Sequence, residues 1–260
     1  MEHCLVCEAE LPPPELVGCD LGFGVEGEFA VSICPTCGAG VSVPVLEAGE
    51  LASFYPPGYE AYRAVDGAAA RLLFRAYHAW RDVLTRRSPP VSDILSLPPG
   101  RLLDVGCGKG DPGELLVRGG WTVVGVDLSD EACGIARTRG IDAREGVLGN
   151  VDLTDAAPFD AILFHHSLEH VADPVAELRL AASLLKPAGA LFVSVPNFGS
   201  WQRVRFGTHW YPLELPRHRT HFTARSLAMA LARAGLEPVA TSTQSTFRTL
   251  PLSLQHAAFG

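Results

Sequence analysis

The chain has 260 residues, 47% of them hydrophobic, which is enough to bury one core and leave residues for a small second domain. Its net charge is -8, and the first 50 residues hold nine acidic side chains and no Lys or Arg, which disfavours nucleic acid as a partner. No run approaches the roughly 18 to 20 apolar residues that span a bilayer, and the acidic start lacks a signal-peptide pattern, so we expect a cytoplasmic protein.

The first 50 residues contain two Cys-x2-Cys pairs, Cys4 with Cys7 and Cys34 with Cys37. Four thiolates complete a tetrahedral Zn2+ site, and paired cysteines in a reducing compartment more often bind metal than form disulfides. We therefore predict a structural zinc ribbon over residues 1–50, with a small β-hairpin in the stretch 22–33. A redox role is disfavoured because neither pair has a basic neighbour. The acidic surface of the ribbon is a candidate site for a protein partner.

Residues 51–98 have the pattern of a linker and a connecting helix. Proline-rich clusters at 55–58, 88–90 and 97–100 are typical of turns. Between the first two clusters, apolar residues recur at helical spacing along one face of residues 68–87. This pattern predicts a helix packed on the domain that follows, and a lid over a substrate is the alternative.

From residue 99 onward, strand and helix patterns alternate. Strands are expected at 102–106, 122–127, 142–146, 159–166, 190–197 and 236–244, and helices from about 112 and at 131–139, 174–185 and 226–235. This alternation predicts an α/β fold with a doubly wound, mostly parallel sheet over residues 99–260.

A glycine loop follows the first of these strands directly. Gly106, Gly108 and Gly110 allow a sharp turn and a close approach of the backbone to a ligand. The spacing is G-x-G-x-G, so pyrophosphate binding does not follow from it. Asp127 ends the next strand, where a carboxylate can accept hydrogen bonds from both hydroxyls of a ribose. Strand, glycine loop, helix, strand and acid in this order are a stronger signal than the loop alone.

The stretches LLDVGCGKG, VVGVDLS, FDAILFHHSLEHVADP and LLKPAGALFVSVPN resemble class I S-adenosylmethionine-dependent methyltransferases over residues 100–245. The Cys-rich front end and PRHRTHFT resemble, more loosely, bacterial members that modify sugars, natural products or envelope precursors. The resemblance implies a Rossmann-like fold that binds S-adenosylmethionine. It implies a methionine-end contact at Asp104, a ribose contact at Asp127, adenine contacts at Val147 and Leu148, a methyl-side histidine at His165 or His166, and further cofactor contacts at Gly106, Cys107, Gly108, Gly110 and Leu128.

The sequence departs from the family pattern in two places. Lys109 and Asp111-Pro112 replace commoner residues of the glycine loop. The family sheet also ends with a hairpin of two strands, whereas the residues after 244 form a poor strand that contains Pro251. We therefore expect the sequence to be truncated before the last strand.

Six of the nine histidines fall between residues 165 and 221, each after an expected strand end. Histidine takes a proton near neutral pH, so His166 and His218 are the candidate bases and Tyr211 is a further catalytic candidate. The insert 196–222 is both aromatic and basic, and it predicts a substrate cap. In this cap Trp210, Tyr211 and His218 would contact the acceptor, and Arg217 or Arg219 would pair with an acidic group. The alternative is a surface excursion held by its aromatic side chains.

Together these features predict methyl transfer from S-adenosylmethionine to an oxygen or carbon of a small-molecule acceptor, such as a sugar, a natural product or an envelope precursor. Two alternatives stay open. The first is an RNA methyltransferase that uses the ribbon as a clamp, which the acidic ribbon disfavours. The second is a non-catalytic module that binds the cofactor or docks a protein.

Overall fold

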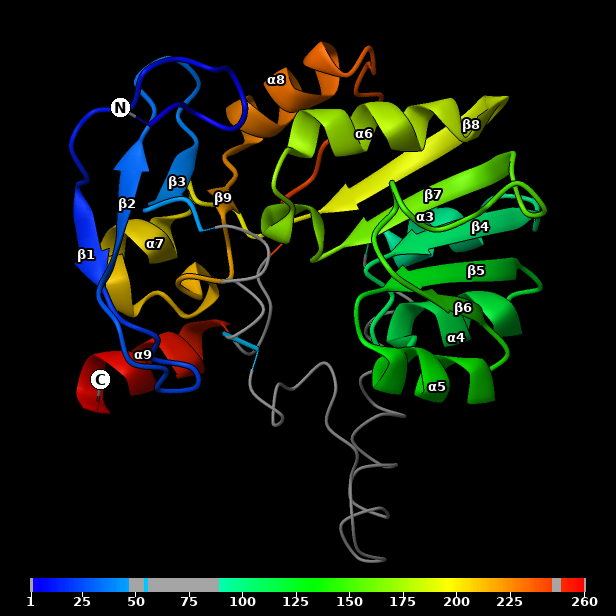
Figure 1. The fold of residues 1–260 in the computed structure, drawn as a ribbon, viewed down its shortest axis with the longest axis horizontal. Helices are drawn as coiled ribbons and strands as arrows, with labels where there is room; N and C mark the ends of the chain where they lie inside the picture. Colours follow the sequence, from blue (N-terminus) through cyan, green and yellow to red (C-terminus); the bar gives the residue numbers. More distant parts are fainter. Residues whose placement is uncertain (1, 47–53, 56–88, 245–248, 260) are drawn as a thin grey trace, which may run out of the picture. The chain divides into compact units, whose positions relative to one another are not determined.

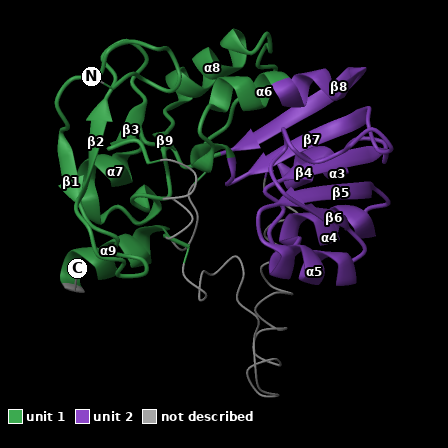
Figure 2. Cartoon of the chain, viewed as in Figure 1, with its two compact units in different colours: residues 1–56, 168–179, 195–260 green, residues 57–167, 180–194 purple. Residues whose placement is uncertain are grey.

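The computed structural model describes residues 2–46, 54–55, 89–244 and 249–259 (Figure 1). It divides the chain into two compact units (Figure 2). Residues 1–56, 168–179 and 195–260 form one, here called the ribbon unit, and residues 57–167 and 180–194 form the other, the sheet unit. This division differs from the predicted boundaries at residues 50 and 98. The predicted connecting helix at 68–87 lies outside the described residues.

The sheet unit contains five parallel strands in the order β6-β5-β4-β7-β8 (Figure 1). Their bounds are β4 Arg101–Val105, β5 Thr122–Asp127, β6 Asp142–Glu145, β7 Phe159–His165 and β8 Leu185–Ser194. The order reverses direction between β4 and β7, and ligands of doubly wound sheets bind at the carboxyl ends of the strands beside such a switch point. The predicted fold class is confirmed.

Apolar runs in the central strands explain the sheet. Leu102 and Leu103 of β4 and Ile162 and Leu163 of β7 are all fully buried, as expected for strands covered on both faces. Helices α4 and α5 pack beside β5 and β6. The helices in the described residues of this unit are α3 Val91–Leu95, α4 Asp111–Arg118, α5 Asp130–Thr138 and the last residues of α6 Pro174–Ser183.

The ribbon unit is built on an antiparallel sheet of order β1-β2-β3-β9. Its strands are β1 Leu16–Gly18, β2 Phe29–Ile33, β3 Gly40–Val43 and β9 Thr220–His221. Since β9 pairs with β3, the chain after residue 195 folds onto the N-terminal segment and the two form one unit. Within its described residues, the helices are η1 Leu168–His170, the first residues of α6 Pro174–Ser183, α7 Trp201–Phe206, η2 Gly207–His209, η3 Tyr211–Leu213, α8 Ala224–Arg233 and α9 Thr249–Phe259.

Two predicted strands differ in the structure. The hairpin predicted within 22–33 has strand only from Phe29, because the carboxylate of Asp20 accepts the N–H groups of Gly22 and Phe23 and holds a turn there. The strand predicted at 236–244 is wrong. Pro238 lacks an N–H for a ladder, and Val239 is fully exposed.

The ribbon unit has its own core, formed by Phe29, Val31, Phe198, Trp210, Leu213 and Leu215. Trp210 is only 3% exposed, and its ring lies 6.3 Å from that of Phe198. The prediction that Trp210 contacts the acceptor is therefore wrong, because this side chain is used in packing.

Among the described helices, none is both long and apolar enough to cross a membrane.

A buried ion pair joins the turn after β1 to the segment before β9. Arg217 Nη2 lies 2.6 Å from Asp20 Oδ1, Nη1 lies 2.8 Å from Oδ2, and both side chains are fully buried. Although burial opposes it, the guanidinium of Arg217 holds the pKa of Asp20 below its usual range. Arg217 also binds Glu214, with Nε 3.1 Å from Oε1. The acidic groups that Arg217 pairs with are therefore Asp20 and Glu214 of the ribbon unit itself.

Replacing Asp20 by Ala should lower the free energy of unfolding by about 3–5 kcal/mol, because it leaves the Arg217 guanidinium buried and without this partner. Urea denaturation measures the change. The matched control is Glu26→Ala, at an exposed acid of the same loop, which should cost less than about 0.5 kcal/mol. Equal losses in the two variants would contradict the role given to the ion pair.

Candidate functional site

The turn between β4 and α4 is built from glycines in a left-handed conformation. Gly106, Gly108 and Gly110 have φ of 75°, 51° and 78°. A Cβ on Gly106 would lie 2.4 Å from the Cβ of Ser167, so a side chain fits there neither by conformation nor by space. The N–H of Gly106 donates to the carbonyl of Val126, 2.8 Å away, which ties the loop to the end of β5. The predicted glycine loop thus has the conformation that its sequence requires.

Asp104 lies in β4 just before this loop and is 1% exposed. Within the described part of the chain, its Oδ2 atom has no hydrogen-bond partner. Burial, with a further contribution from the charge of Asp127, raises the pKa of Asp104 to about 7. A buried carboxyl group of this kind fits a ligand that brings a positively charged donor, because such a donor would compensate the charge.

Asp127 ends the neighbouring strand β5 and is 8% exposed. Its Oδ2 accepts the N–H of Gly108 at 2.8 Å, and its Oδ1 accepts the N–H of Ser129 at 3.0 Å. These bonds fix the carboxylate while each oxygen keeps a lone pair for a further donor. Burial raises the pKa of Asp127, and the two backbone hydrogen bonds oppose the rise. The geometry fits the predicted contact with a pair of hydroxyl groups.

The other predicted cofactor contacts divide into exposed and buried side chains. Leu128, directly after β5, is 67% exposed, and Val147, in the turn after β6, is 42% exposed. The N–H of Gly146 donates to the carbonyl of Asp127, so these apolar side chains stand at the ends of paired strands. Leu148 and Cys107 are instead buried in the sheet unit, so their side chains contribute packing. Cys107 would offer a ligand only its backbone.

His165 and His166 stand at the carboxyl end of β7. Their rings are perpendicular, with centroids 4.8 Å apart. His166 is exposed and has a φ of 56°, a conformation that is rare for residues other than glycine and that concentrates at functional sites. Its N–H donates to the carbonyl of Ser194 at the end of β8. Both predicted methyl-side histidines therefore lie at the end of the sheet where the glycine loop lies.

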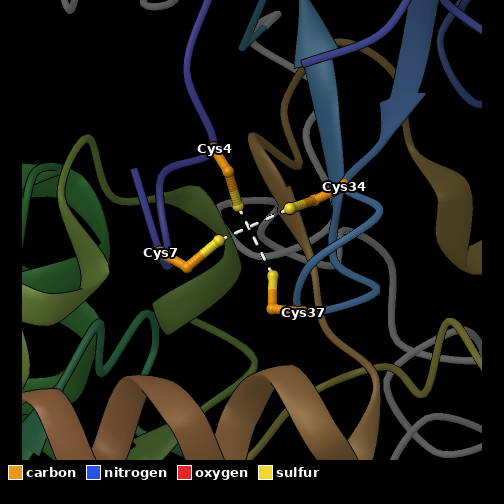
Figure 3. A group of neighbouring side chains, drawn as sticks. All are labelled: Cys4, Cys7, Cys34 and Cys37. Atoms are coloured by element: carbon orange, nitrogen blue, oxygen red, sulfur yellow. Dashed lines mark hydrogen bonds between the residues drawn. The ribbon is translucent and has the colours of Figure 1, made fainter. Parts of the chain in front are cut away.

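The ribbon unit brings the four predicted cysteines together (Figure 3). The Sγ atoms of Cys4 and Cys37 are 3.5 Å apart, those of Cys7 and Cys34 are 3.4 Å apart, and all four lie within 4.8 Å of one another. The two turns repeat one pattern, in which the fourth residue after the first cysteine donates its N–H to that cysteine's carbonyl. Glu8 and Gly38 fill this position, both with positive φ. Four convergent thiols suit tetrahedral Zn2+.

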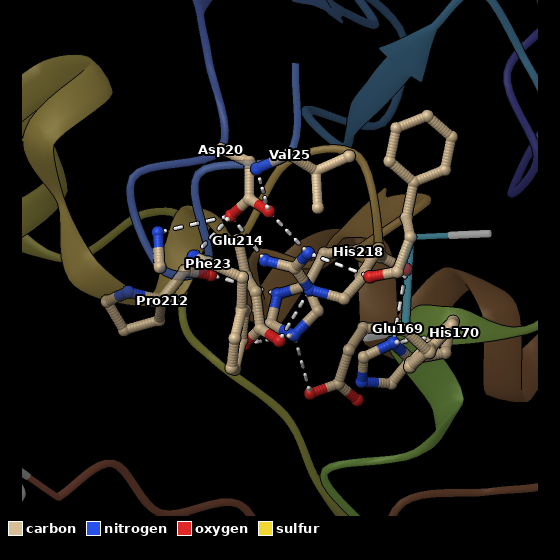
Figure 4. A network of polar contacts seen from close by, with 12 residues as sticks. Asp20, Phe23, Val25, Glu169, His170, Pro212, Glu214 and His218 are labelled. Atoms are coloured by element: carbon tan, nitrogen blue, oxygen red, sulfur yellow. Dashed lines mark hydrogen bonds and ion pairs between the residues drawn. The ribbon is translucent and has the colours of Figure 1, made fainter. Parts of the chain in front are cut away.

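A second polar cluster in the ribbon unit contains Glu169, His170, Glu214 and His218 (Figure 4). The Nε2 atom of His218 lies 3.5 Å from a carboxylate oxygen of Glu214 and 4.0 Å from one of Glu169. The imidazole rings of His170 and His218 are 4.6 Å apart. Burial, together with the nearby His218, lowers the pKa of His170 to about 4, so His170 is neutral at physiological pH.

Sequence reasoning singled out only His218 from this cluster as a site residue. Glu214 was missed, although its spacing of four residues from His218 was a usable signal. Glu214 has a φ of 43°, which sets it apart from the surrounding chain. His221 lies in the same segment, but its Nε2 lies 3.0 Å from the hydroxyl of Ser42, and burial lowers its pKa to about 3. His221 therefore serves packing.

Tyr211 is not part of this cluster in the contacts that the structure gives. Its N–H donates to the hydroxyl of Ser253 in α9, and its ring lies 5.7 Å from that of His256. Arg219 is 8% exposed, and its N–H donates to the carbonyl of Glu169. The predicted roles of both side chains toward an acceptor remain predictions.

Comparisons of this chain with a family model and with curated proteins both find methyltransferases. A family model described as a methyltransferase domain matches residues 72–241. A ubiquinone biosynthesis O-methyltransferase of Xylella fastidiosa (strain M23) is 36% identical over 158 residues, which cover 56% of this chain and 64% of the relative. A protein of the same name from Xanthomonas campestris pv. campestris (strain B100) is 42% identical over 113 residues, covering 41% and 47%. The chain thus spans less than two thirds of the length of these curated relatives.

Solved structures share the fold. Magnesium protoporphyrin IX methyltransferase of Synechocystis PCC 6803, with bound S-adenosylhomocysteine, matches with a TM-score of 0.53 at 16% identity, covering 77% of this chain and 94% of that one. The [4+2]-cyclase SpnF matches with a TM-score of 0.53 at 28% identity, covering 68% and 65%. The first likeness concerns the fold alone.

The raised pKa of Asp104 predicts a loss of stability as the pH rises. Between about pH 4 and pH 7 the folded chain keeps a proton on Asp104 that the unfolded chain has released, so stability falls through this window, by up to about 4 kcal/mol for this group. Denaturation at pH 5 and at pH 8 should therefore show a smaller fall for Asp104→Asn than for the parent protein. The same fall in both proteins would contradict the protonation assigned to Asp104.

Proposed function

Because this chain belongs to the methyltransferase-domain family, we propose that it transfers a methyl group from S-adenosylmethionine to an oxygen of a small-molecule acceptor. The observation that carries the proposal is the buried Asp104, which stands beside a glycine loop of left-handed conformation. Asp127 on the adjacent strand completes the pair of carboxyl groups.

Each of these groups has a distinct task in the proposal. When bound, S-adenosylmethionine supplies a methyl group carried on a positively charged sulfur. Asp104 would accept hydrogen bonds from the ammonium group at the methionine end, and Asp127 would accept them from the ribose hydroxyls. The glycine loop lets the backbone approach the ligand, while Leu128 and Val147 offer exposed apolar surface for the adenine ring. Binding and alignment of this kind supply much of the rate in a direct transfer.

An oxygen acceptor is favoured by the curated relatives, whose names describe them as O-methyltransferases. A hydroxyl group must lose its proton as its oxygen bonds to the methyl carbon and the carbon–sulfur bond breaks. His166 and His218 remain the candidates for helping this loss of a proton. We further propose that residues 196–222 contact the acceptor, with Tyr211 and His218 as contributing side chains.

A second use of the fold has a specific observation in its favour. The cyclase SpnF shares this fold at 28% identity, and its name describes a reaction other than methyl transfer. A chain that binds S-adenosylmethionine but never forms S-adenosylhomocysteine would fit that second use. An assay for S-adenosylhomocysteine release across a library of hydroxylated small molecules separates the two.

We also propose that the four ribbon cysteines bind one structural Zn2+. Their convergence and the repeated turn geometry support this, and the metal would hold the two cysteine turns together.

Replacing Asp127 by Asn should weaken the binding of S-adenosylmethionine by at least about tenfold, since an amide presents one acceptor oxygen and its NH2 group would oppose the N–H donors of the loop. Equilibrium dialysis with labelled cofactor measures the change. The control is Asp130→Asn, at an exposed acid just beyond β5, which should bind as the parent protein does. Equal affinity in all three proteins would contradict the ribose contact.

Replacing His166 or His218 by Ala should lower turnover by about 10²-fold or more while the affinity for the cofactor changes little. Steady-state release of S-adenosylhomocysteine, measured with an acceptor found in the library, tests this. His209→Ala, in η2 of the same segment, serves as the control. If both variants turned over as fast as the control, neither histidine would assist the reaction.

Zinc removal should destabilise the ribbon unit. Cys34→Ser should lose the bound zinc and melt at a lower temperature, because a hydroxyl is a poor zinc ligand. Cys19→Ser is the matched control, since Cys19 is exposed and stands outside the cluster. Elemental analysis and thermal denaturation read out both variants. Full zinc content in Cys34→Ser would show that the ribbon cysteines do not hold the metal.

A further inference from the structure

A second group of metal-ligating side chain types lies in the ribbon unit, apart from the four cysteines. It consists of Glu169, His170, Glu214 and His218. Within the described residues, Glu169, His170 and His218 place one ligand atom each within 4.8 Å of the others. Glu214 joins them through its carboxylate, 3.5 Å from His218 Nε2. The four come from two segments far apart in sequence, the η1 turn and the loop before β9 (Figure 4).

The backbone fixes the tautomers of both histidines. His218 Nδ1 lies 2.9 Å from the carbonyl oxygen of Pro212, and His170 Nδ1 lies 3.1 Å from that of Arg217. A carbonyl oxygen only accepts, so in each ring Nδ1 carries the hydrogen and donates it. With the hydrogen on Nδ1, the ring atom left to bind a metal is Nε2. Metal-binding histidines are oriented in this way, with one ring nitrogen donating to a carbonyl and the other bonded to the metal.

The spacing of the ligand atoms also suits a metal. Imidazole nitrogens and carboxylate oxygens bind first-row metals at about 2.0–2.2 Å, which separates neighbouring ligand atoms by roughly 3–3.5 Å. His218 Nε2 lies 3.5 Å from Glu214 and 4.0 Å from Glu169, which exceeds the usual length of a direct hydrogen bond. Glu169, His170 and His218 already place their ligand atoms within 4.8 Å of one another, and Glu214 lies beside His218 as the fourth group.

Surrounding contacts hold the ligands in place. The N–H of Arg219 donates to the carbonyl of Glu169, and the N–H of His218 donates to the carbonyl of Glu214. Arg217 binds Glu214 from one side while Asp20 shares its guanidinium. The hydroxyl of Tyr55 lies 3.0 Å from His170 Nδ1. The ligand set is therefore built into the ribbon unit by backbone and buried polar contacts.

We propose that Glu169, His170, Glu214 and His218 bind a divalent first-row transition-metal ion, distinct from the zinc of the ribbon. Two imidazoles and two carboxylates favour borderline and harder ions such as Mn2+, Fe2+, Co2+ or Zn2+. Where the proposed function holds, such an ion gives His218 the role of a ligand.

The test uses Mn2+ with the full-length, zinc-loaded protein. Mn2+ favours oxygen and nitrogen ligands and does not displace zinc from thiolates, so it reports on this site alone. Electron paramagnetic resonance titration should find one Mn2+ bound per chain. Glu169→Gln and His218→Ala should each raise the Kd by more than about 100-fold, and His209→Ala should leave it unchanged. Co2+ is titrated in parallel.

The proposal is overturned if neither Mn2+ nor Co2+ binds beyond the ribbon zinc, or if His218→Ala binds Mn2+ as His209→Ala does. Should a variant fail to fold, nuclear magnetic resonance of the parent protein tests whether Mn2+ binds at this cluster. Substoichiometric Mn2+ should broaden the ring signals of His170 and His218 and spare that of His209, and uniform broadening or none contradicts the site. Cofactor binding is measured separately by calorimetry, so a protein that binds cofactor without Mn2+ refutes only the metal site.

Discussion

The left-handed turn between β4 and α4 is the constraint on which the proposed site depends. Three glycines within five residues take positive φ, and the space beside Gly106 is already filled by Ser167. This turn lets α4 begin at Asp111 and brings the N–H of Gly108 to the carboxylate of Asp127. Asp104, in the strand that leads into this turn, is buried. The conformation of the loop therefore determines where α4 begins and how the carboxylate of Asp127 is held.

Each unit buries a carboxyl group, but the pKa of the two groups shifts in opposite directions. Asp20 is fully buried, but Arg217 compensates its charge with two hydrogen bonds, and its pKa falls. Asp104 is just as buried, and its pKa rises to about 7. A fold gains nothing in stability from such a group. Because Asp104 lies next to the glycine loop, we assign it to the proposed cofactor site.

Local patterns made most of the sheet unit predictable. The five parallel strands, the glycine loop with Asp127, and the cysteine pairs each arise from residues close in sequence, where periodicity and spacing carry the information. The division into units was not predictable, because it depends on β9, a strand of two residues that pairs with β3 across the chain. The burial of Trp210 in a core and the pairing of Arg217 with Asp20 depend on contacts between segments that are far apart in the sequence. The sequence of an aromatic and basic segment does not show whether its side chains contact a ligand or pack in a core.

The most direct test of the central claim is a calorimetric titration of the zinc-loaded protein with S-adenosylhomocysteine at pH 6 and at pH 8. We expect one binding site per chain, with a Kd about tenfold lower at pH 8, because Asp104 must be ionised to pair with the ammonium group and its pKa is about 7. In Asp104→Asn this dependence on pH should vanish. If the folded, zinc-loaded protein bound no ligand at either pH, the carboxyl ends of β4 and β5 would not be a cofactor site.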